Sequence, residues 1–443
     1  MPRVFSFGLA VATFLGASRL SAWAAPPPKL SKGPYLTDLS DTHVEVRFEL
    51  SAAAPARVTF ELPGDASPAR TLDEPSTAMH VVRASGLKAA TTYGYTVRVG
   101  GALAGGGHFT TAPEPTLPPA SAAPTTFLVF GDDRSDPTAH AAVVRAMAAT
   151  PADFLVNTGD VVADGGRDAD WQSFFDVEAT LLKDHALFLC VGNHELVDDE
   201  AGANFARYFG LRDEHGAVTP YGTTRWSSVR FFFLNGMHDW RRGEEREWLE
   251  RELAHADDEP GLVWRVAVVH HGPWSSGPHA GNAKLLSAGV PEMLAAHHVD
   301  LVLSGHDHLY ERGHVGTVKY LVSGGGGAPL YPVQNRLASS AKAESVYHFV
   351  EVTVSPDAVR TVARGVDGTV IDDCGFHKAT GWECDPPAAL PAPRAPSPQP
   401  GSSRCGCRVP GCAPGGEKVT SMLLLAVGAL GALRLRASLR RRG

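Results

Sequence analysis

The 443-residue sequence has little of several features that define other classes of protein. It has six cysteines, and none belongs to its central histidine- and aspartate-rich motifs, which excludes a structural zinc site built on thiolates there. No basic run precedes the C-terminal end and the formal net charge is −8, so we expect no nucleic-acid-binding surface. The apolar run at 419–433 is shorter than the roughly 20 residues of a transmembrane helix. The glycines at 324–327 lack the Lys-Ser/Thr pair of a P-loop.

Five apolar runs have the length of buried strands, and each ends directly in Asp, Asn or His, usually beside Gly. They lie at 126–130, 153–157, 186–191, 263–269 and 300–304. The polar residues that follow them are Asp132, Asp160, Asn193 with His194, His270 with His271, and His306 with His308. In open α/β sheets, ligands bind outside the carboxyl ends of the strands. The sequence therefore predicts an α/β domain with a single polynuclear metal site.

These motifs resemble the calcineurin-like metallophosphoesterases, and within them the purple acid phosphatase-like branch. The family order is an Asp block, then GD, GNH, a His after a strand and GHxH, and all five occur here in that order. The resemblance extends to HDHLYER at 306–312 and YLVSGGGGAPLY at 320–331. It implies a fold of two mixed β-sheets sandwiched between helices, and a binuclear metal centre.

The resemblance also implies a role for each motif residue. One cation would be held by Asp132 and His308, the other by Asn193, His270 and His306, and Asp160 would bridge the two. His194 would not be a ligand; it would lie over the substrate as proton donor or phosphate contact. Carboxylate, amide and imidazole ligands suit Fe, Mn or Zn, and the sequence does not decide among them.

Three positions depart from the family pattern. Arg134 stands where the family has His or Gly; it predicts either a bidentate contact with phosphate or a salt bridge with Asp133 or Asp136. Ala163 stands where purple enzymes have a ligating Tyr, so we expect weak occupancy of the first metal position. The histidine block is doubled: the spacing to Trp274 makes His270 the ligand and leaves His271 near the substrate.

The predicted function is hydrolysis of phosphate esters, with phosphomonoesters as the expected substrates. Two cations about 4 Å apart would activate a metal-bound hydroxide for in-line attack, and His194 would protonate the departing alkoxide. One alternative is a phosphodiesterase or nucleotidase with the same metal core. Another is a surface-binding protein without catalysis, whose first metal site is degenerate.

The sequence before the catalytic motifs divides into a leader, an all-β region and a linker. Residues 1–25 have the pattern of a signal peptide. Short alternating runs at 30–113 predict a β-sandwich, with strands at 43–50, 56–62 and 93–99, and resemble a fibronectin type III-like domain. We expect His43 and His80 to be exposed there. The Pro/Ala/Ser-rich stretch 114–124 is the linker to a catalytic domain at 125–372, with helices at 138–149, 168–182 and 244–256.

The C-terminal part predicts attachment to the cell surface. Residues 373–404 contain an expected disulfide between Cys374 and Cys384 and a Pro-rich linker. Residues 405–443 combine three cysteines, a short apolar segment and an arginine cluster, and resemble a myxobacterial-type C-terminal sorting signal; a plain tail anchor is the alternative. The mature protein is thus expected to be exported, and either anchored at the outer surface or secreted. Its oligomeric state is left open.

Overall fold

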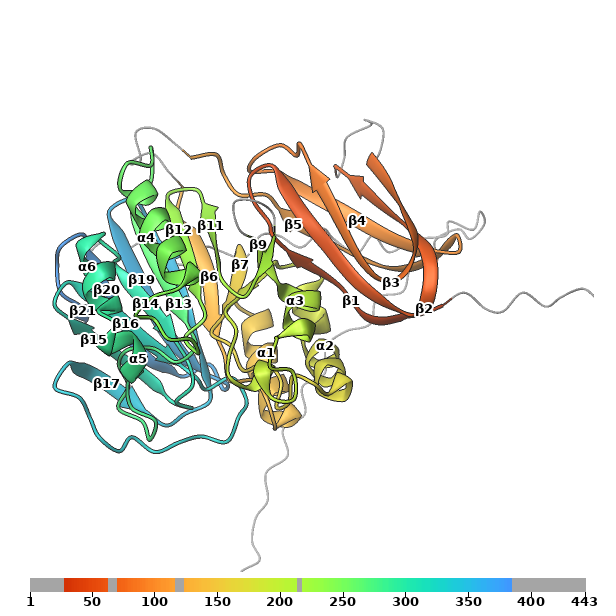
Figure 1. Ribbon diagram of the computed structural model, residues 1–443. Coiled ribbons are helices and arrows are strands. Elements are labelled where there is room, and N and C mark those ends of the chain that lie inside the picture. Colours follow the sequence, from red (N-terminus) through yellow and green to blue (C-terminus); the bar gives the residue numbers. More distant parts are fainter. Residues whose placement is uncertain (1–27, 63–69, 116–122, 213–216, 385–443) are drawn as a thin grey trace, which may run out of the picture. The chain divides into compact units, whose positions relative to one another are not determined.

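The computed structural model describes residues 28–62, 70–115, 123–212 and 217–384 (Figure 1). The predicted signal peptide, most of the predicted linker, the Pro-rich segment and the sorting tail lie outside these residues. Within the described ranges, no helix combines the length and the apolar character that crossing a membrane requires.

The N-terminal region is all-β and antiparallel. Its strands are β1 (Leu30–Thr37), β2 (His43–Glu61), β3 (Arg70–Ser85), β4 (Thr92–Val99) and β5 (Ala102–Thr110), in the order β1-β2-β4-β5, with β3 also paired to β2. The sequence predicted two strands between 43 and 62, but β2 is continuous and accommodates the interruption as register shifts against β3. The fibronectin type III-like character of the region stays a prediction.

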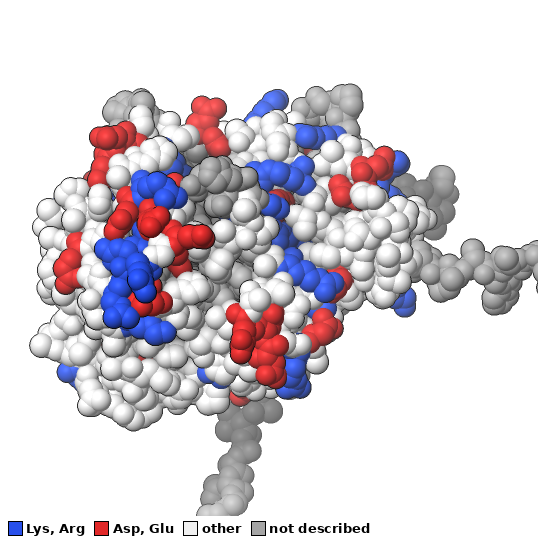
Figure 2. Space-filling model, in the orientation of Figure 1, with Lys and Arg blue, Asp and Glu red and all other residues white. Residues whose placement is uncertain are grey.

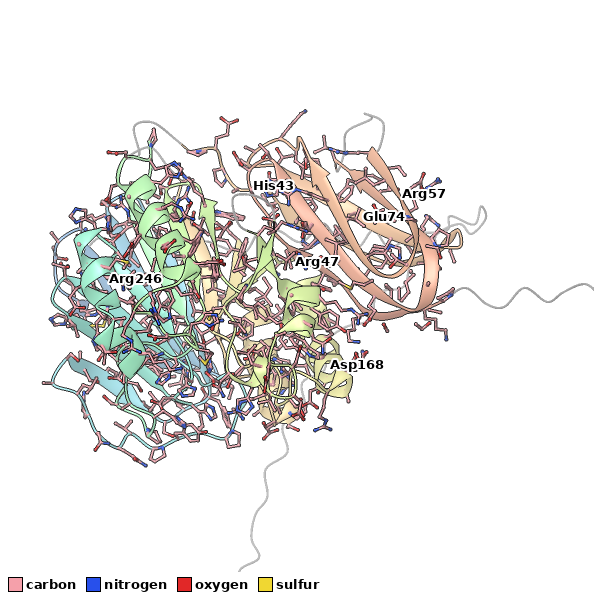
Figure 3. The ribbon with its side chains drawn as sticks, in the orientation of Figure 1. His43, Arg47, Arg57, Glu74, Asp168 and Arg246 are labelled. Carbon is pink, nitrogen blue, oxygen red and sulfur yellow. A yellow bond between two sulfur atoms is a disulfide. The ribbon has the colours of Figure 1, made fainter. Side chains whose placement is uncertain are left out.

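His80 is not exposed, contrary to the prediction. It is 1% exposed, because its ring stacks on Phe48 at 4.6 Å between centroids and one ring nitrogen meets Ala54 O at 3.2 Å. The alternating pattern placed His80 correctly in a strand. It did not show that His80 is buried, because that depends on Phe48 in the neighbouring strand β2. His43, labelled in Figure 3, is partly exposed, and its Nε2 lies 3.3 Å from Asp38 Oδ1.

The catalytic region contains two mixed sheets, as predicted, and each has seven strands. One sheet has the order β21-β20-β19-β18-β6-β7-β8 and the other β11-β12-β13-β14-β16-β15-β17. The first consists of β6 (Thr125–Phe130), β7 (Phe154–Asn157), β8 (Leu187–Leu189), β18 (His348–Val354), β19 (Ala358–Gly365), β20 (Val370–His377) and β21 (Glu383–Cys384). The second consists of β11 (Gly222–Trp226), β12 (Val229–Leu234), β13 (Trp264–Val269), β14 (Leu301–Ser304), β15 (Tyr310–Val315), β16 (Val318–Ser323) and β17 (Ser340–Glu344).

Three apolar cores hold four layers together. The first joins the two sheets to each other: Phe127 of β6 meets Phe231 of β12 at 5.2 Å between ring centroids. The second buries the other face of the first sheet under α1 (Pro137–Ala148), α2 (Asp168–Leu182) and α3 (Ala203–Phe209). The third does the same for the second sheet with α4 (Glu244–Asp257), α5 (Ala283–Ser287) and α6 (Val290–Ala296). Two sheets between helices therefore form the body that carries the site (Figure 1).

Helix α1 begins where its capping residue predicts. Asp136 accepts hydrogen bonds from the N–H groups of Thr138 and Ala139 at the start of α1, and Pro137 occupies its first position. The bounds of α2 are those expected from its aromatic spacing. A short two-stranded sheet, β9 (Leu211–Arg212) with β10 (Val218–Thr219), follows α3.

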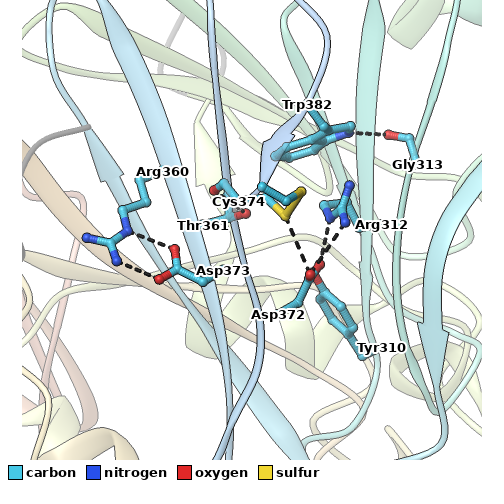
Figure 4. The surroundings of a disulfide bond; sticks show 10 residues. Tyr310, Arg312, Gly313, Arg360, Thr361, Asp372, Asp373, Cys374 and Trp382 are labelled. Atoms are coloured by element: carbon cyan, nitrogen blue, oxygen red, sulfur yellow. Dashed lines mark hydrogen bonds and ion pairs between the residues drawn. A yellow bond between two sulfur atoms is a disulfide. The ribbon is translucent and has the colours of Figure 1, made fainter. Parts of the chain in front are cut away.

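The first sheet extends past residue 372, where the sequence placed the domain boundary, because β20 and β21 add to its edge. The predicted Cys374–Cys384 disulfide is confirmed and joins these two strands. Beside it, Asp372 accepts from Tyr310 Oη at 2.8 Å and Arg312 Nε at 2.6 Å (Figure 4). The two sheets are thus linked by polar contacts as well as by the apolar core.

Charged side chains mostly neutralise one another at the surface. Figure 2 shows basic and acidic groups side by side over the part of the surface where α4 lies. Arg246, labelled in Figure 3, pairs with Glu250 at 2.9 Å along that helix. In the all-β region, Lys32 binds both Glu49 and Asp168, and Arg47 donates to Tyr208 O at 3.0 Å.

Candidate metal centre

The predicted site residues meet at the carboxyl ends of strands from both sheets. Parallel pairing of β6, β7 and β8 brings the turns after these strands to one edge, and parallel pairing of β13 with β14 does the same in the second sheet. Three of the residues there, Asp132, Asp160 and His306, have left-handed backbone φ angles of 58°, 61° and 69°. Such angles are costly for residues other than Gly and recur at functional sites.

His270 lies at the centre of the first half of the site. Its Nδ1 lies 2.8 Å from Thr158 O, so that nitrogen carries a proton and Nε2 presents a lone pair whenever the ring is neutral. Around Nε2 lie Asn193 Oδ1 at 3.2 Å, His306 Nδ1 at 3.2 Å and Asp160 Oδ1 at 3.3 Å. One proton on His270 Nε2 can form a hydrogen bond with only one of these three atoms. One cation can be ligated by all three and by Nε2 as well. The donor set of this half therefore fits a metal ion.

The ionisation of these groups reflects the same concentration of acceptors. Burial opposes a charge on His270, but the carboxylates of Asp160 and Asp132 outweigh it and raise the pKa of His270 to about 9. Burial and the neighbouring His270 lower the pKa of His306 to about 2. The pKa of Asp160 is lowered although burial opposes this, because His270, His194 and Arg134 face the carboxylate. The carboxylates thus favour one positive charge, on His270, and that charge disfavours a second one on His306.

The second half of the site contains Asp132, His308 and Arg134. His308 Nε2 lies 3.4 Å from Asp132 Oδ1, a buried oxygen without a hydrogen bond. Arg134 donates to Asp160 Oδ2 at 3.1 Å and lies 3.3 Å from His308 Nε2. The prediction of a salt bridge with Asp133 or Asp136 is therefore wrong: the loop turns the guanidinium inward, where it pairs with Asp160.

His194 lies at the opening of the site. Its backbone N–H donates to Asp160 Oδ1 at 2.9 Å and its Nδ1 lies 2.7 Å from Ala163 O. The ring proton is thereby fixed on Nδ1, and Nε2 faces Asp160 Oδ2 from 3.9 Å. The side chain is 26% exposed, so a substrate can reach Nε2, and this placement suits proton transfer rather than ligation.

Two further histidines border His306, and one of them was not predicted. The His271 ring lies 4.2 Å from the His306 ring between centroids, and burial lowers the pKa of His271. His279 lies 4.4 Å from the same ring, with its Nδ1 2.9 Å from Asp307 Oδ1. His279 follows no strand and belongs to no motif noted in the sequence, so only its spacing after His270 could have indicated it.

A buried carboxylate, also not predicted, fixes the turns that carry the ligands. Glu195 accepts N–H bonds from Gly192, Asp160 and Val161 at 2.6–3.0 Å. Burial and the nearby Asp160 raise its pKa to about 7. Because these bonds join the turn after β7 to the turn after β8, Glu195 holds Asp160 and Asn193 in their relative positions.

The residues that follow the HxH pair form a β-strand. Tyr310–Val315 is strand β15, and Glu311 accepts from Ser276 N at 2.6 Å and Tyr320 Oη at 3.0 Å. Neither Tyr310 nor Arg312 contacts the histidines; both bind Asp372.

A second buried group of potential ligands lies next to the site: Asp133, His140 and Glu178. His140 Nε2 lies 2.8 Å from Glu178 Oε1, and the ligand atoms of the three residues lie within 4.8 Å of one another. Asp133 also accepts from Asn157 Nδ2 at 2.6 Å, and burial raises its pKa to about 8.

The fold and this donor set define a metallophosphoesterase domain. Residues 125–310 match the family model for calcineurin-like phosphoesterases. Among curated proteins, the chain is similar to purple acid phosphatase 4 of Arabidopsis thaliana, with 29% identity over 201 residues, which are 39% of this chain and 58% of that protein. Purple acid phosphatase 15 of Arabidopsis thaliana is 28% identical over 134 residues, 28% of this chain and 25% of that protein. The chain thus spans a quarter to 58% of these relatives' length.

Solved structures agree on the fold. A purple acid phosphatase from yellow lupin (Lupinus luteus) seeds superposes with a TM-score of 0.66 at 18% identity, covering 79% of this chain and 74% of that one. The structure of PhoD superposes with a TM-score of 0.61 at 14% identity, covering 80% and 92%. At these identities the similarity concerns the architecture, and the α/β class predicted from the sequence is confirmed.

Proposed function

We propose that the protein is a metal-dependent hydrolase of phosphate esters that acts on phosphomonoesters. The observation that carries the proposal is the ring of acceptor atoms around His270 Nε2, within 3.3 Å and open to a substrate beside His194. The metals that suit these ligands are Fe, Mn and Zn.

A cation here would be held by Asp160, Asn193, His270 and His306. It would supply Lewis acidity, activating water as the nucleophile and offsetting charge on the phosphate. Thr158 O keeps the His270 proton on Nδ1, so that Nε2 can ligate. Glu195 keeps the two ligand-bearing turns in register. The chain's own contribution is thus a set of donors ordered before the metal binds.

His194 is the proposed general acid. The oxygen of a water forms a bond to phosphorus and gives up a proton to solvent while the ester P–O bond breaks, and the Nε2 proton of the His194 imidazolium passes to the departing oxygen. Its Nδ1 contact with Ala163 O fixes the direction of Nε2. Arg134, His271 and His279 are proposed to donate to phosphate oxygens. The alcohol part of the ester is placed in a cavity of about 340 Å³ beside Arg134, lined also by Ser135, Ala163 and Arg167.

The test compares a simple aryl phosphate monoester with its diester, using the purified protein loaded with Mn²⁺, Zn²⁺ or Fe²⁺ in turn. We expect the monoester to have the higher kcat/KM and the His270→Ala variant to be inactive. Preferred turnover of the diester would indicate a phosphodiesterase or nucleotidase. Metal uptake without turnover of either ester, in the wild type and in His194→Ala alike, would indicate the surface-binding alternative.

We also propose that the mature protein is exported and attached to the cell surface through its C-terminal tail. In this proposal its N-terminal all-β region is a fibronectin type III-like domain. The Cys374–Cys384 disulfide supports export, because disulfides persist in oxidising compartments. Fractionation of cells that express the full chain, with and without residues 405–443, tests this: loss of the tail should release the protein into the medium.

A further inference from the structure

The side chain of Arg134 lies inside the metal centre, between two residues expected to hold the first cation. Its Nε donates to Asp160 Oδ2 at 3.1 Å, and its Nη2 lies 3.3 Å from His308 Nε2. His308 Nδ1 lies 2.7 Å from Pro329 O, so Nδ1 carries the ring proton and Nε2 accepts from the guanidinium. The Arg134 side chain is 13% exposed, which places its charge in the site and not in solvent.

A guanidinium and a metal ion compete for these two atoms. A cation ligated by Asp160 Oδ2 and His308 Nε2 needs bonds of about 2.1 Å to both, in the space that Arg134 Nε and Nη2 occupy. Arginine offers N–H donors only and stays charged at any working pH, so it cannot ligate a cation and repels one nearby. Among the residues expected to hold the first cation (Asp132, Asp160 and His308), Asp132 Oδ1 is the acceptor that has no hydrogen bond.

The two halves of the site also differ in how their ligand atoms converge. Asp160, His270 and His306 bring three ligand atoms within 4.8 Å of one another. The convergent His, Asp and Glu groups among the described residues do not include Asp132 or His308. The backbone on either side of Arg134 is left-handed, with φ of 58° at Asp132 and 74° at Ser135, and this fixes the direction in which the side chain leaves the loop.

We infer that the guanidinium of Arg134 replaces the first cation of a two-metal centre. The site then works with one metal ion, at Asp160, Asn193, His270 and His306, and one permanent positive charge supplied by the chain. The catalytic role that this inference gives to Arg134 rests on the proposed function. The test of the inference does not, because it counts bound metal ions. In this arrangement Arg134 donates to the phosphate oxygens that a second cation would contact.

The test counts metal ions in the purified full chain. The protein is stripped with a chelator, titrated with Mn²⁺ alone, desalted and analysed for manganese per chain, and its electron paramagnetic resonance spectrum is recorded. We expect one tightly bound Mn²⁺ in the wild type, with an uncoupled spectrum, and none at this site in His270→Ala. In Arg134→Gly, which frees the space between Asp160 and His308, we expect two ions and a spin-coupled spectrum.

Matched variants separate the possible results. Arg167→Gly removes another arginine of the same cavity, one that faces Asp170 at 3.8 Å, and should leave the count at one. A second ion in the wild type that disappears in His308→Ala, or a spin-coupled wild-type spectrum, would overturn the inference. A second ion that disappears in His140→Ala instead lies at Asp133, His140 and Glu178 and leaves the inference standing. The wild-type count needs no variant to fold, and it is independent of whether any ester is hydrolysed.

Discussion

Around His270, four ligand atoms face one another and share at most one proton, whereas around His308 the neighbouring acceptors face the guanidinium of Arg134. The two halves have Asp160 in common: its Oδ1 faces His270 and its Oδ2 faces Arg134. Both halves collect buried acceptors, and burial makes uncompensated negative charge costly. The first half is suited to compensation by an exchangeable metal ion, the second to compensation by a residue of the chain.

The difference shows that one site can compensate the negative charge of its buried carboxylates in two ways, with a metal ion in one half and with an arginine side chain in the other. A metal ion adds Lewis acidity but can be lost to a chelator, whereas a guanidinium cannot be lost and cannot activate water. Variants of the two halves should therefore fail in different ways, and the following predictions test this from the largest expected effect to the smallest.

Replacing His270 should have the largest effect. His270→Ala removes the ligand on which the other three converge, so we expect loss of the metal ion and of at least about 4 kcal/mol of transition-state stabilisation, roughly 10³-fold in kcat/KM. Metal analysis and steady-state kinetics measure both. As a control, His297→Ala removes a histidine that pairs with Asp257 away from the site and should change neither. Retention of the metal in His270→Ala would contradict the assignment.

Replacing His194 should reduce turnover without releasing the metal. In His194→Asn we expect kcat to fall about 10²- to 10⁴-fold, the range for loss of a general acid. The loss should be larger for an alkyl phosphate than for p-nitrophenyl phosphate, whose leaving group needs little protonation. Equal losses on both substrates would show that His194 acts on the phosphate and not on the leaving oxygen. Asn193→Ala, one residue away, should instead release the metal.

The half around His270 could be predicted from the sequence, because it depends on where buried strands end. β6, β7, β13 and β14 begin and end within a residue or two of their apolar runs, and parallel pairing then brings their ends together. The helix α2 has the bounds that the sequence predicted. Trp171, Phe174 and Phe175 recur there at helical spacing and form one buried stripe.

The half around Arg134 could not be predicted in the same way. The residue's partners are 26 and 174 positions away, so local charge pairing indicated Asp133 or Asp136 instead. His279 and Glu195 were missed for a related reason: both act through long-range contacts that no periodicity records. The burial of His80 likewise depends on a ring contributed by the neighbouring strand. Local patterns predict elements, and contacts between elements decide individual side chains.

Replacing Arg134 conservatively should have a moderate effect. Arg134→Lys keeps the charge but loses the fork that reaches Asp160 and His308 together, so we expect kcat/KM to fall about tenfold, by roughly 1.4 kcal/mol. The bound metal should stay at its wild-type amount, which distinguishes this variant from His270→Ala. A loss as large as that of His270→Ala, with release of the metal, would show a different role for Arg134. It would then support the ligands around His270 rather than compensate the negative charge around His308.

The last effect concerns stability and not turnover, and it should appear as a pH dependence beneath the half around Arg134. His348 N donates to Gly325 O at 3.0 Å, in the glycine-rich loop that also reaches Gly131 through Gly326. Burial lowers the pKa of His348 to about 4, below its ordinary 6.5. The unfolded chain therefore binds the proton first, so this contribution to stability is complete above pH 6.5 and is lost as the pH falls toward 4, up to about 3 kcal/mol. Thermal unfolding of wild type and His348→Gln between pH 8 and pH 4 measures it: the variant should have the flatter curve, and parallel curves would assign the acid sensitivity to other groups.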